Sequence, residues 1–177
     1  MLIRPADPER DAAPCAAIYA PYVAGSAVSF EDEPPEAKDL AARMARITAT
    51  HPWLVAETEA GEVAGYAYGT AHRDRAAYRW AADVAVYVAG DHQRRGVGTR
   101  LYGELLSRLS RQGIRTAVAG ITLPNPGSVA LHESFGFQPV GVYRRIGWKA
   151  GAWRDVGWWQ LELLPPTDAK PPEPGPP

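Results

Sequence analysis

The 177-residue sequence predicts one mixed α/β domain, in which about seven strands form a mostly antiparallel sheet and about four helices flank it. Apolar residues alternate with polar ones in several short segments and follow a helical spacing in others. With 46% hydrophobic and 22% charged residues, the chain is long enough to bury one core. Residues 165–177 include seven prolines, so we expect the domain to span residues 1–164 and the remainder to be a disordered or extended tail.

The N-terminal half is expected to run strand, helix, helix and then three strands. Asp7 can cap the first helix, and Pro8 suits its first turn. The second helix carries Leu40, Met44 and Ile47 on one face. The three strands show apolar runs or alternation between turn residues. The sequence therefore predicts strands at residues 2–4, 53–57, 63–69 and 80–88, and helices at residues 7–25 and 35–50.

The C-terminal half is expected to alternate helices and strands and to end in two paired strands. A helix that follows the strand at 80–88 would cross over the sheet and return the chain as a parallel strand. Asn125 can cap a short helix that ends at Gly136. Four tryptophans in the last two strands could fill the core or form a dimer face: Trp148, Trp153, Trp158 and Trp159. The sequence predicts helices at residues 98–112 and 125–136, and strands at 114–122, 139–148 and 152–163.

Charge and composition argue against several classes of function. A net charge of −1 argues against broad binding to nucleic acid. The one cysteine, Cys15, excludes an internal disulfide, and its small apolar neighbours predict an inert core thiol. The four histidines are spread singly, so we predict no metal site. No segment approaches the ~20 apolar residues of a membrane span, and the N-terminus lacks a signal-peptide layout, so a cytoplasmic location is expected by elimination.

The segment HQRRGVGTRLY, residues 92–102, predicts an anion-binding turn before a helix. It is not a phosphate-binding P-loop, and Leu101 stands where a dinucleotide fingerprint needs its third glycine. Gly96 and Gly98 let the backbone N–H groups of residues 94–99 converge on a pyrophosphate, which the helix dipole also attracts. The alternative is an ordinary turn with exposed arginines.

Gln93-Arg94-Arg95-Gly96-Val97-Gly98 resembles the Q/R-x-x-G-x-G/A loop of the GNAT superfamily of acyl-CoA N-acetyltransferases. Further segments are similar to the phosphinothricin acetyltransferase branch, whose relatives acetylate methionine sulfoximine and methionine sulfone. They are residues 52–57, 61–65, 75–80, 86–88, 131–133 and 155–157. The resemblance covers about residues 2–164. It implies the GNAT fold with a splayed parallel strand pair, acetyl-CoA as co-substrate and a homodimer.

The same resemblance implies how the coenzyme is held. Backbone groups of Val86, Tyr87 and Val88 would bind the pantetheine arm and polarise the thioester carbonyl. Asn125 would contact the coenzyme arm. The residues expected at the pyrophosphate are Arg94, Arg95, Gly96, Val97, Gly98 and Thr99. From the residues alone, the strand could equally be core and Asn125 an ordinary helix cap.

Asp83 is the predicted catalytic base, because it is the lone acid in YRWAADVAVYV and a carboxylate can take a proton from an amine. The branch carries Glu there, and the shorter Asp83 favours a water relay. His132 stands where the branch has a functional histidine and could assist the proton path or line the acceptor pocket. A solvated face for Asp83 and a packed or surface role for His132 are the alternatives. Tyr87, Tyr102 and Tyr143 are equal candidates for the acid that protonates the thiolate.

Arg73, Arg75 and Tyr78 are predicted to bind the acceptor, since arginine matches carboxylate and phosphinate groups and the branch binds at these positions. Phe30 matches an apolar pocket position of the branch. An exposed basic loop and core packing are the alternatives. The expected function is acetyl transfer to the α-amine of phosphinothricin, methionine sulfoximine or methionine sulfone, by direct attack in a ternary complex. Acetylation of another small amine or a peptide N-terminus, and a non-catalytic acyl-CoA-binding module, are the rivals.

Overall fold

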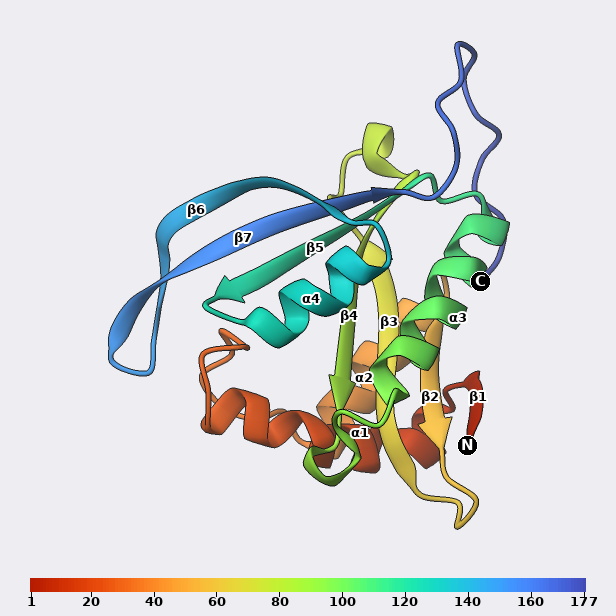
Figure 1. Cartoon of the computed structure of the whole chain (residues 1–177). Coiled ribbons are helices and arrows are strands. Elements are labelled where there is room, and N and C mark those ends of the chain that lie inside the picture. Colours follow the sequence, from red (N-terminus) through yellow and green to blue (C-terminus); the bar gives the residue numbers. More distant parts are fainter.

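A computed structural model describes all 177 residues and contains one seven-stranded sheet and four α-helices (Figure 1). The strands are β1 (Leu2–Pro5), β2 (Trp53–Glu57), β3 (Val63–Ala71), β4 (Ala81–Val88), β5 (Thr116–Leu123), β6 (Gln138–Lys149) and β7 (Ala152–Glu162). The helices are α1 (Pro8–Ala24), α2 (Ala37–Thr48), α3 (Val97–Gln112) and α4 (Pro126–Ser134). The strand order is β1-β2-β3-β4-β5-β7-β6, and every neighbouring pair is antiparallel except β4–β5.

The predicted mixed fold, its seven strands, its four helices and its single parallel pair are confirmed. Asp7 accepts a hydrogen bond from the Glu9 N–H at 2.9 Å and so caps α1 as expected. The sequence did not indicate two short 3-10 helices, η1 (Ala76–Tyr78) and η2 (Gly90–His92), which flank β4. None of the four helices combines the length and the apolar character that crossing a membrane requires.

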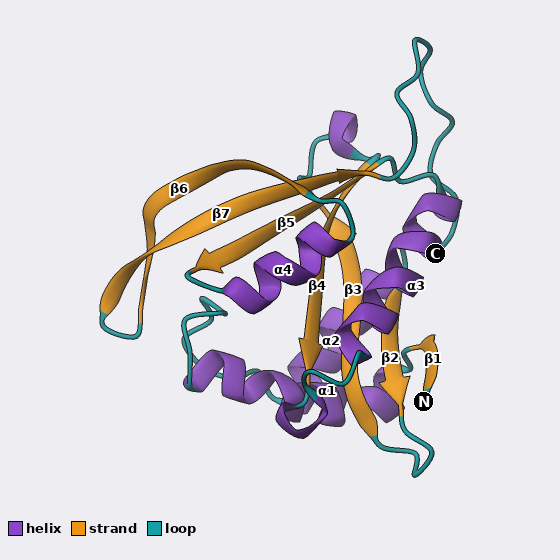
Figure 2. Cartoon of the chain, in the orientation of Figure 1, coloured by secondary structure: helices purple, strands orange, loops and turns teal.

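The sheet separates two apolar cores, with α1 and α2 on one face and α3 and α4 on the other (Figure 2). Leu101, Leu105 and Leu109 of α3 pack against the face that α3 and α4 cover, because they recur at helical spacing. On the opposite face, Cys15 packs beside Trp53 and is fully buried. The predicted place of Cys15 in the core is confirmed, and burial raises the pKa of its thiol to about 12.

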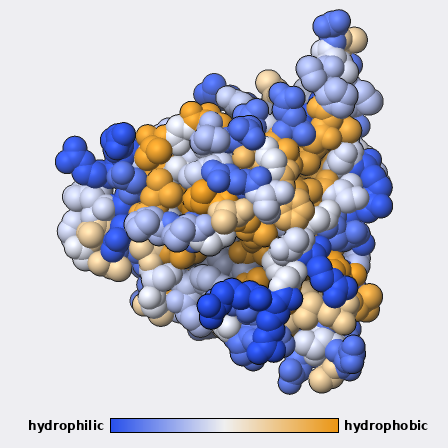
Figure 3. All heavy atoms as spheres, viewed as in Figure 1, coloured by the Kyte–Doolittle hydropathy of each residue, from blue (hydrophilic) through white to orange (hydrophobic).

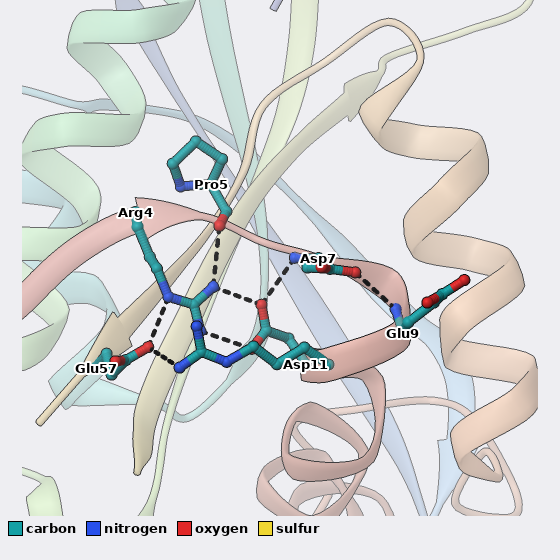
Figure 4. Close-up of polar contacts among 7 residues, drawn as sticks. Arg4, Pro5, Asp7, Glu9, Asp11 and Glu57 are labelled. Atoms are coloured by element: carbon teal, nitrogen blue, oxygen red, sulfur yellow. Dashed lines mark hydrogen bonds and ion pairs between the residues drawn. The ribbon is translucent and has the colours of Figure 1, made fainter. Parts of the chain in front are cut away.

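A buried ion-pair network fastens β1 to α1 and β2 (Figure 4). Arg4 donates to both oxygens of Asp11, at 2.6 and 2.7 Å, and to Glu57 at 2.6 Å. Asp11 is fully buried and also accepts the Asp7 N–H at 2.8 Å. Burial alone would raise the pKa of Asp11, but the hydrogen bonds and charges of Arg4 and the Asp7 N–H hold it below its usual value.

Residues 165–177 form no helix or strand, yet the end of this tail contacts the domain. Trp80 Nε1 donates to the Pro172 carbonyl at 2.8 Å, and Arg79 pairs with Glu173 at 2.7 Å. The Gly175 N–H donates to the Gln112 carbonyl at 2.7 Å. The tail therefore lies against the end of α3 and the segment that leads into β4 (Figure 1).

The tryptophans of the last two strands divide between core and surface. Trp159 is buried, and its Nε1 donates to Glu133 at 3.2 Å. Trp148 and Trp153 pack edge to face near the tip of the hairpin, but 60% and 59% of their surfaces remain exposed. Other apolar residues of β6 are also exposed: Val140, Val142, Tyr143 and Ile146. The hairpin extends beyond the rest of the sheet, so this apolar surface is accessible (Figure 1).

Candidate active site

The parallel strands β4 and β5 pair only over their first three residues, and then separate. Asp83, which lies opposite Val118, is the last residue of β4 that pairs with β5. The Ala89 N–H bonds to β3, so by alternation the backbone groups of Val86 and Val88 face the gap that β5 has left. The predicted splayed pair is thus observed, and its gap begins directly after Asp83.

A cleft of about 430 Å³ connects this gap with the N-terminus of α3. Figure 3 shows a hollow in the surface between α4 and α1. Four parts of the chain line the cleft. They are Tyr22 and Val28 at and after the end of α1, Val86 and Val88 of β4, Gln93 to Thr99 except Arg95, and Asn125, Gly127, Ser128 and Leu131 at α4. The lining includes Arg94 and no carboxylate. The predicted residue Arg95 is exposed and lies outside it.

The backbone at the N-terminus of α3 fits a pyrophosphate group. No N–H of residues 94–99 donates a hydrogen bond to another backbone carbonyl. Arg94 and Gly96 adopt left-handed conformations, with φ of 57° and 78°, which turn the chain sharply into the helix. Unbonded N–H groups and the positive end of the helix dipole together favour an anion. Asn125 caps α4 by accepting the Ser128 N–H at 3.1 Å, which leaves its amide nitrogen free for a ligand.

Two residues that the sequence analysis did not single out as site residues hold the end of β4. The Tyr22 hydroxyl donates to the Val88 carbonyl at 2.6 Å, and Gln93 Nε2 donates to the Tyr22 oxygen at 2.9 Å. Both side chains line the cleft. Gln93 was visible as part of the glycine-loop motif. Tyr22 carried no signal, because it is 66 residues from Val88 and sits in an ordinary helical pattern.

Gly98→Asp is expected to weaken acetyl-CoA binding at least ~10-fold, which corresponds to about 1.4 kcal/mol. A Cβ at this position would stand 3.6 Å from Leu131 and 3.7 Å from Val88, so a side chain would enter the cleft and bring a negative charge to the anion site. Titration calorimetry measures the change. Gly90→Asp is the control, because nothing lies within 4 Å of a Cβ there. Equal affinities for the Gly98 variant and the wild type would contradict the site.

Asp83 faces the side of the sheet that α1 and α2 cover. Tyr87 lies four residues further along β4 and therefore points to the same face. It packs edge-on against Tyr19, with ring centroids 4.8 Å apart. Asp83 Oδ1 lies 2.7 Å from His72 Nδ1, and Tyr78 packs edge-on against the His72 ring. Burial raises the pKa of Asp83, while the His72 hydrogen bond and the Arg73 charge oppose that rise.

His132 lies in α4, on the opposite face from Asp83, so the structure does not bring the two predicted catalytic residues together. His132 Nδ1 is 2.7 Å from the Ser128 carbonyl and must carry a hydrogen there. Its Nε2 then accepts the hydroxyl hydrogen of Tyr102 at 2.6 Å. Burial lowers the pKa of His132, which favours the neutral ring. With Asn125 and Ser128, it lines a small cavity within the β4–β5 gap.

The three tyrosines predicted as possible acids also lie apart. Tyr102 is fully buried and already donates to His132, and burial raises its pKa well above the usual value. Tyr87 packs among the tyrosines beside α1, and its pKa is raised in the same way. The backbone groups of Tyr87 bond to β3, so none of them is free for the predicted contact with the pantetheine arm. Tyr143 is half exposed on β6 and packs on Trp158.

The residues predicted to bind the acceptor do not converge on one pocket. Tyr78 packs edge-on against the His72 ring, and the charge of Arg73 acts to lower the pKa of Asp83. Arg73 and Arg75 are exposed and line a separate cavity of about 500 Å³ with the end of the tail. Phe30 packs on β6, where a Cβ at Gly147 would overlap its ring. Only Tyr78 and Arg73 therefore lie close to Asp83. No group of three or more His, Cys, Asp or Glu side chains is placed to hold a metal ion.

Comparisons with known proteins agree with this geometry. The family model described as "Acetyltransferase (GNAT) family" matches residues 15–137. Phosphinothricin N-acetyltransferase of Streptomyces viridochromogenes is 42% identical over 97% of this chain and 93% of its own. L-methionine sulfoximine/L-methionine sulfone acetyltransferase of Pseudomonas aeruginosa is 35% identical over 86% of this chain and 90% of its own. The crystal structure of a GNAT phosphinothricin acetyltransferase from Sinorhizobium meliloti with acetyl-CoA superposes with a TM-score of 0.92, at 34% identity over 97% and 93% of the two chains.

Proposed function

The chain belongs to the GNAT family of acetyltransferases, and from this premise we propose that it acetylates the α-amine of a small amino-acid-like acceptor. The acceptors proposed are phosphinothricin, methionine sulfoximine and methionine sulfone, which the names of its relatives supply. Acetylation would remove the charge of the amine and so detoxify an amino-acid analogue. The co-substrate is acetyl-CoA, and the location proposed for the reaction is the cytoplasm.

One observation carries the proposal: the gap between β4 and β5 begins at a carboxylate. Acetyl-CoA supplies an activated thioester. The free N–H groups of residues 94–99 and the gap-facing backbone of Val86 would hold it, which aims its acyl end toward Asp83. Asp83 would then take the amine proton, directly or through one water molecule, while the amine attacks in a ternary complex. Cys15 is buried, and its raised pKa disfavours an acetyl-cysteine route.

The proposal is tested by thiol release from acetyl-CoA in the presence of phosphinothricin, methionine sulfoximine, methionine sulfone or spermidine. We expect turnover with at least one of the first three. We expect none with spermidine, because Arg73 near Asp83 repels a polycation. Bound acetyl-CoA without turnover on any amino-acid analogue would instead favour a non-catalytic acyl-CoA-binding module. Turnover on peptide N-termini alone would favour the remaining rival.

We also propose that two copies of the chain associate through the β6–β7 hairpin. The exposed side chains of this hairpin are large and apolar, and they include Trp148 and Trp153. Contiguous apolar surface of this kind is typical of protein interfaces. Sedimentation equilibrium at micromolar concentration distinguishes a dimer from a monomer, and a monomer would contradict this proposal.

A further inference from the structure

His72 contacts the proposed base directly, although nothing in the sequence connects the two residues. Its Nδ1 lies 2.7 Å from Asp83 Oδ1. A carboxylate oxygen can only accept, so Nδ1 carries the hydrogen and donates it. Both side chains are partly enclosed, with 17% of His72 and 32% of Asp83 exposed. A charge-assisted hydrogen bond with so little access to water is stronger than one on the open surface.

The chain also holds the His72 ring in place. His72 directly follows β3, which pairs with β4 up to Ala71, so its backbone is anchored beside the Asp83 strand. The Tyr78 ring packs edge-on against it, with centroids 5.5 Å apart. Arg73, the next residue, donates to the His72 carbonyl at 3.2 Å. Tyr68 of β3 faces the same side of the sheet as Asp83.

We propose that His72 is a positioning residue for the acetyl transfer: it holds Asp83 Oδ1, so that Oδ2 alone receives the amine proton. This inference rests on the proposed function. In the step itself, the amine nitrogen bonds to the acyl carbon and the amine proton goes to Oδ2. The carbon–sulfur bond breaks with its electron pair on sulfur, and coenzyme A leaves as the thiolate. The short aspartate side chain is free to rotate, and a fixed rotamer keeps Oδ2 at the end of the gap.

The hydrogen bond has a second effect, on the charge of Asp83. Burial favours the protonated carboxyl group, and donation from His72 favours the carboxylate. Removing His72 should therefore raise the pKa of Asp83 further. The base would then be lost at a higher pH, and the acid limb of the kcat/KM profile would move upward.

Three variants test the role of His72: His72→Ala, His72→Asn and Asp83→Asn. We expect His72→Ala to lower kcat about 10- to 100-fold, with the KM for acetyl-CoA unchanged. Asparagine places an amide N–H close to the position of Nδ1, so His72→Asn should recover most of that loss. The double variant His72→Ala/Asp83→Asn should be no slower than Asp83→Asn alone, because His72 acts through Asp83. Asp74→Ala, in the same exposed loop, is the matched control and should keep full activity.

Two outcomes would overturn the inference. His72→Asn as slow as His72→Ala would show that the imidazole itself takes the proton. Losses that multiply in the double variant would show that His72 acts independently of Asp83. Carboxyl ¹³C NMR of Asp83 adds a readout that needs no turnover: its pKa should be higher in His72→Ala than in the wild type. An unchanged pKa would contradict the contact, whereas an inactive wild type with the expected NMR shift would contradict only the proposed function.

Discussion

Asp83→Asn is expected to lower kcat by about 10² to 10⁴-fold, because an amide cannot take a proton from the acceptor amine. The side chain keeps nearly the same shape, and Asp83 is not among the residues that line the cleft at the N-terminus of α3. The dissociation constant for acetyl-CoA should therefore stay within about twofold of the wild type, within the usual scatter of independent sites. Steady-state kinetics with the best acceptor and calorimetry with acetyl-CoA measure the two effects separately.

The pH dependence of the wild-type rate is a second test of Asp83 as the base. Asp83 acts in its ionised form, and burial raises its pKa above the ordinary aspartate value. The rate should hence fall as pH decreases through that raised pKa, at a higher pH than an exposed aspartate would give. Asp83→Glu, which keeps the carboxylate, should retain far more activity than Asp83→Asn. A kcat of Asp83→Asn within threefold of the wild type would rule out Asp83 as the base.

Arg4→Ala is expected to lower the free energy of unfolding by about 3 to 5 kcal/mol, because the fully buried carboxylate of Asp11 loses its hydrogen-bonded counter-ion and keeps only Arg10, at 4.0 Å, as a nearby positive charge. The Asp7 N–H would be the only hydrogen bond left to Asp11. Urea unfolding followed by tryptophan fluorescence measures the change. Arg10→Ala is the matched control: its side chain is 53% exposed and pairs with Glu57, so we expect a loss below about 1 kcal/mol.

The ion pair also sets a pH dependence of stability. The folded-state pKa of Asp11 is below its ordinary value, so its contribution is complete above the unfolded pKa and is lost as pH falls through the folded pKa. The deficit of Arg4→Ala should accordingly be largest near neutral pH and shrink in acid. A deficit that is equal to that of Arg10→Ala would mean that Asp11 is not held as a buried charge.

Local patterns in the sequence were sufficient to predict most of the fold. The apolar spacing of Leu40, Met44 and Ile47 predicted α2, and the apolar alternation at residues 80–88 predicted β4. Gly96 and Gly98 predicted an anion-binding turn before α3, and the left-handed conformation of Gly96 there agrees with the sharp turn. Signals of this kind depend only on neighbouring residues, so one sequence contains them.

Contacts between distant residues could not be predicted in the same way. The hydrogen bond from Tyr22 to Val88 joins two elements whose sequences look ordinary, and the tail meets Trp80 across 92 residues. The pairing of His72 with Asp83 depends on how the chain passes from β3 to β4, and a single histidine in a loop does not indicate that pairing. His132 illustrates the opposite case. The sequence did not indicate its buried hydrogen bond to Tyr102, and no spacing in the sequence supported a position near Asp83.

The partial pairing of β4 and β5 divides the sheet into two plates, β1–β4 and β5–β7, whose strands are joined at one corner by three residue pairs. A ligand that bonds to β4 beyond Asp83 takes the place of the missing partner strand and bridges the plates. The bound coenzyme then connects the two parts of the sheet. The melting temperature should therefore rise with coenzyme concentration, as for any ligand that binds only the native state. The cell's acyl-CoA level would thus set the rigidity of the protein as well as the rate of its chemistry.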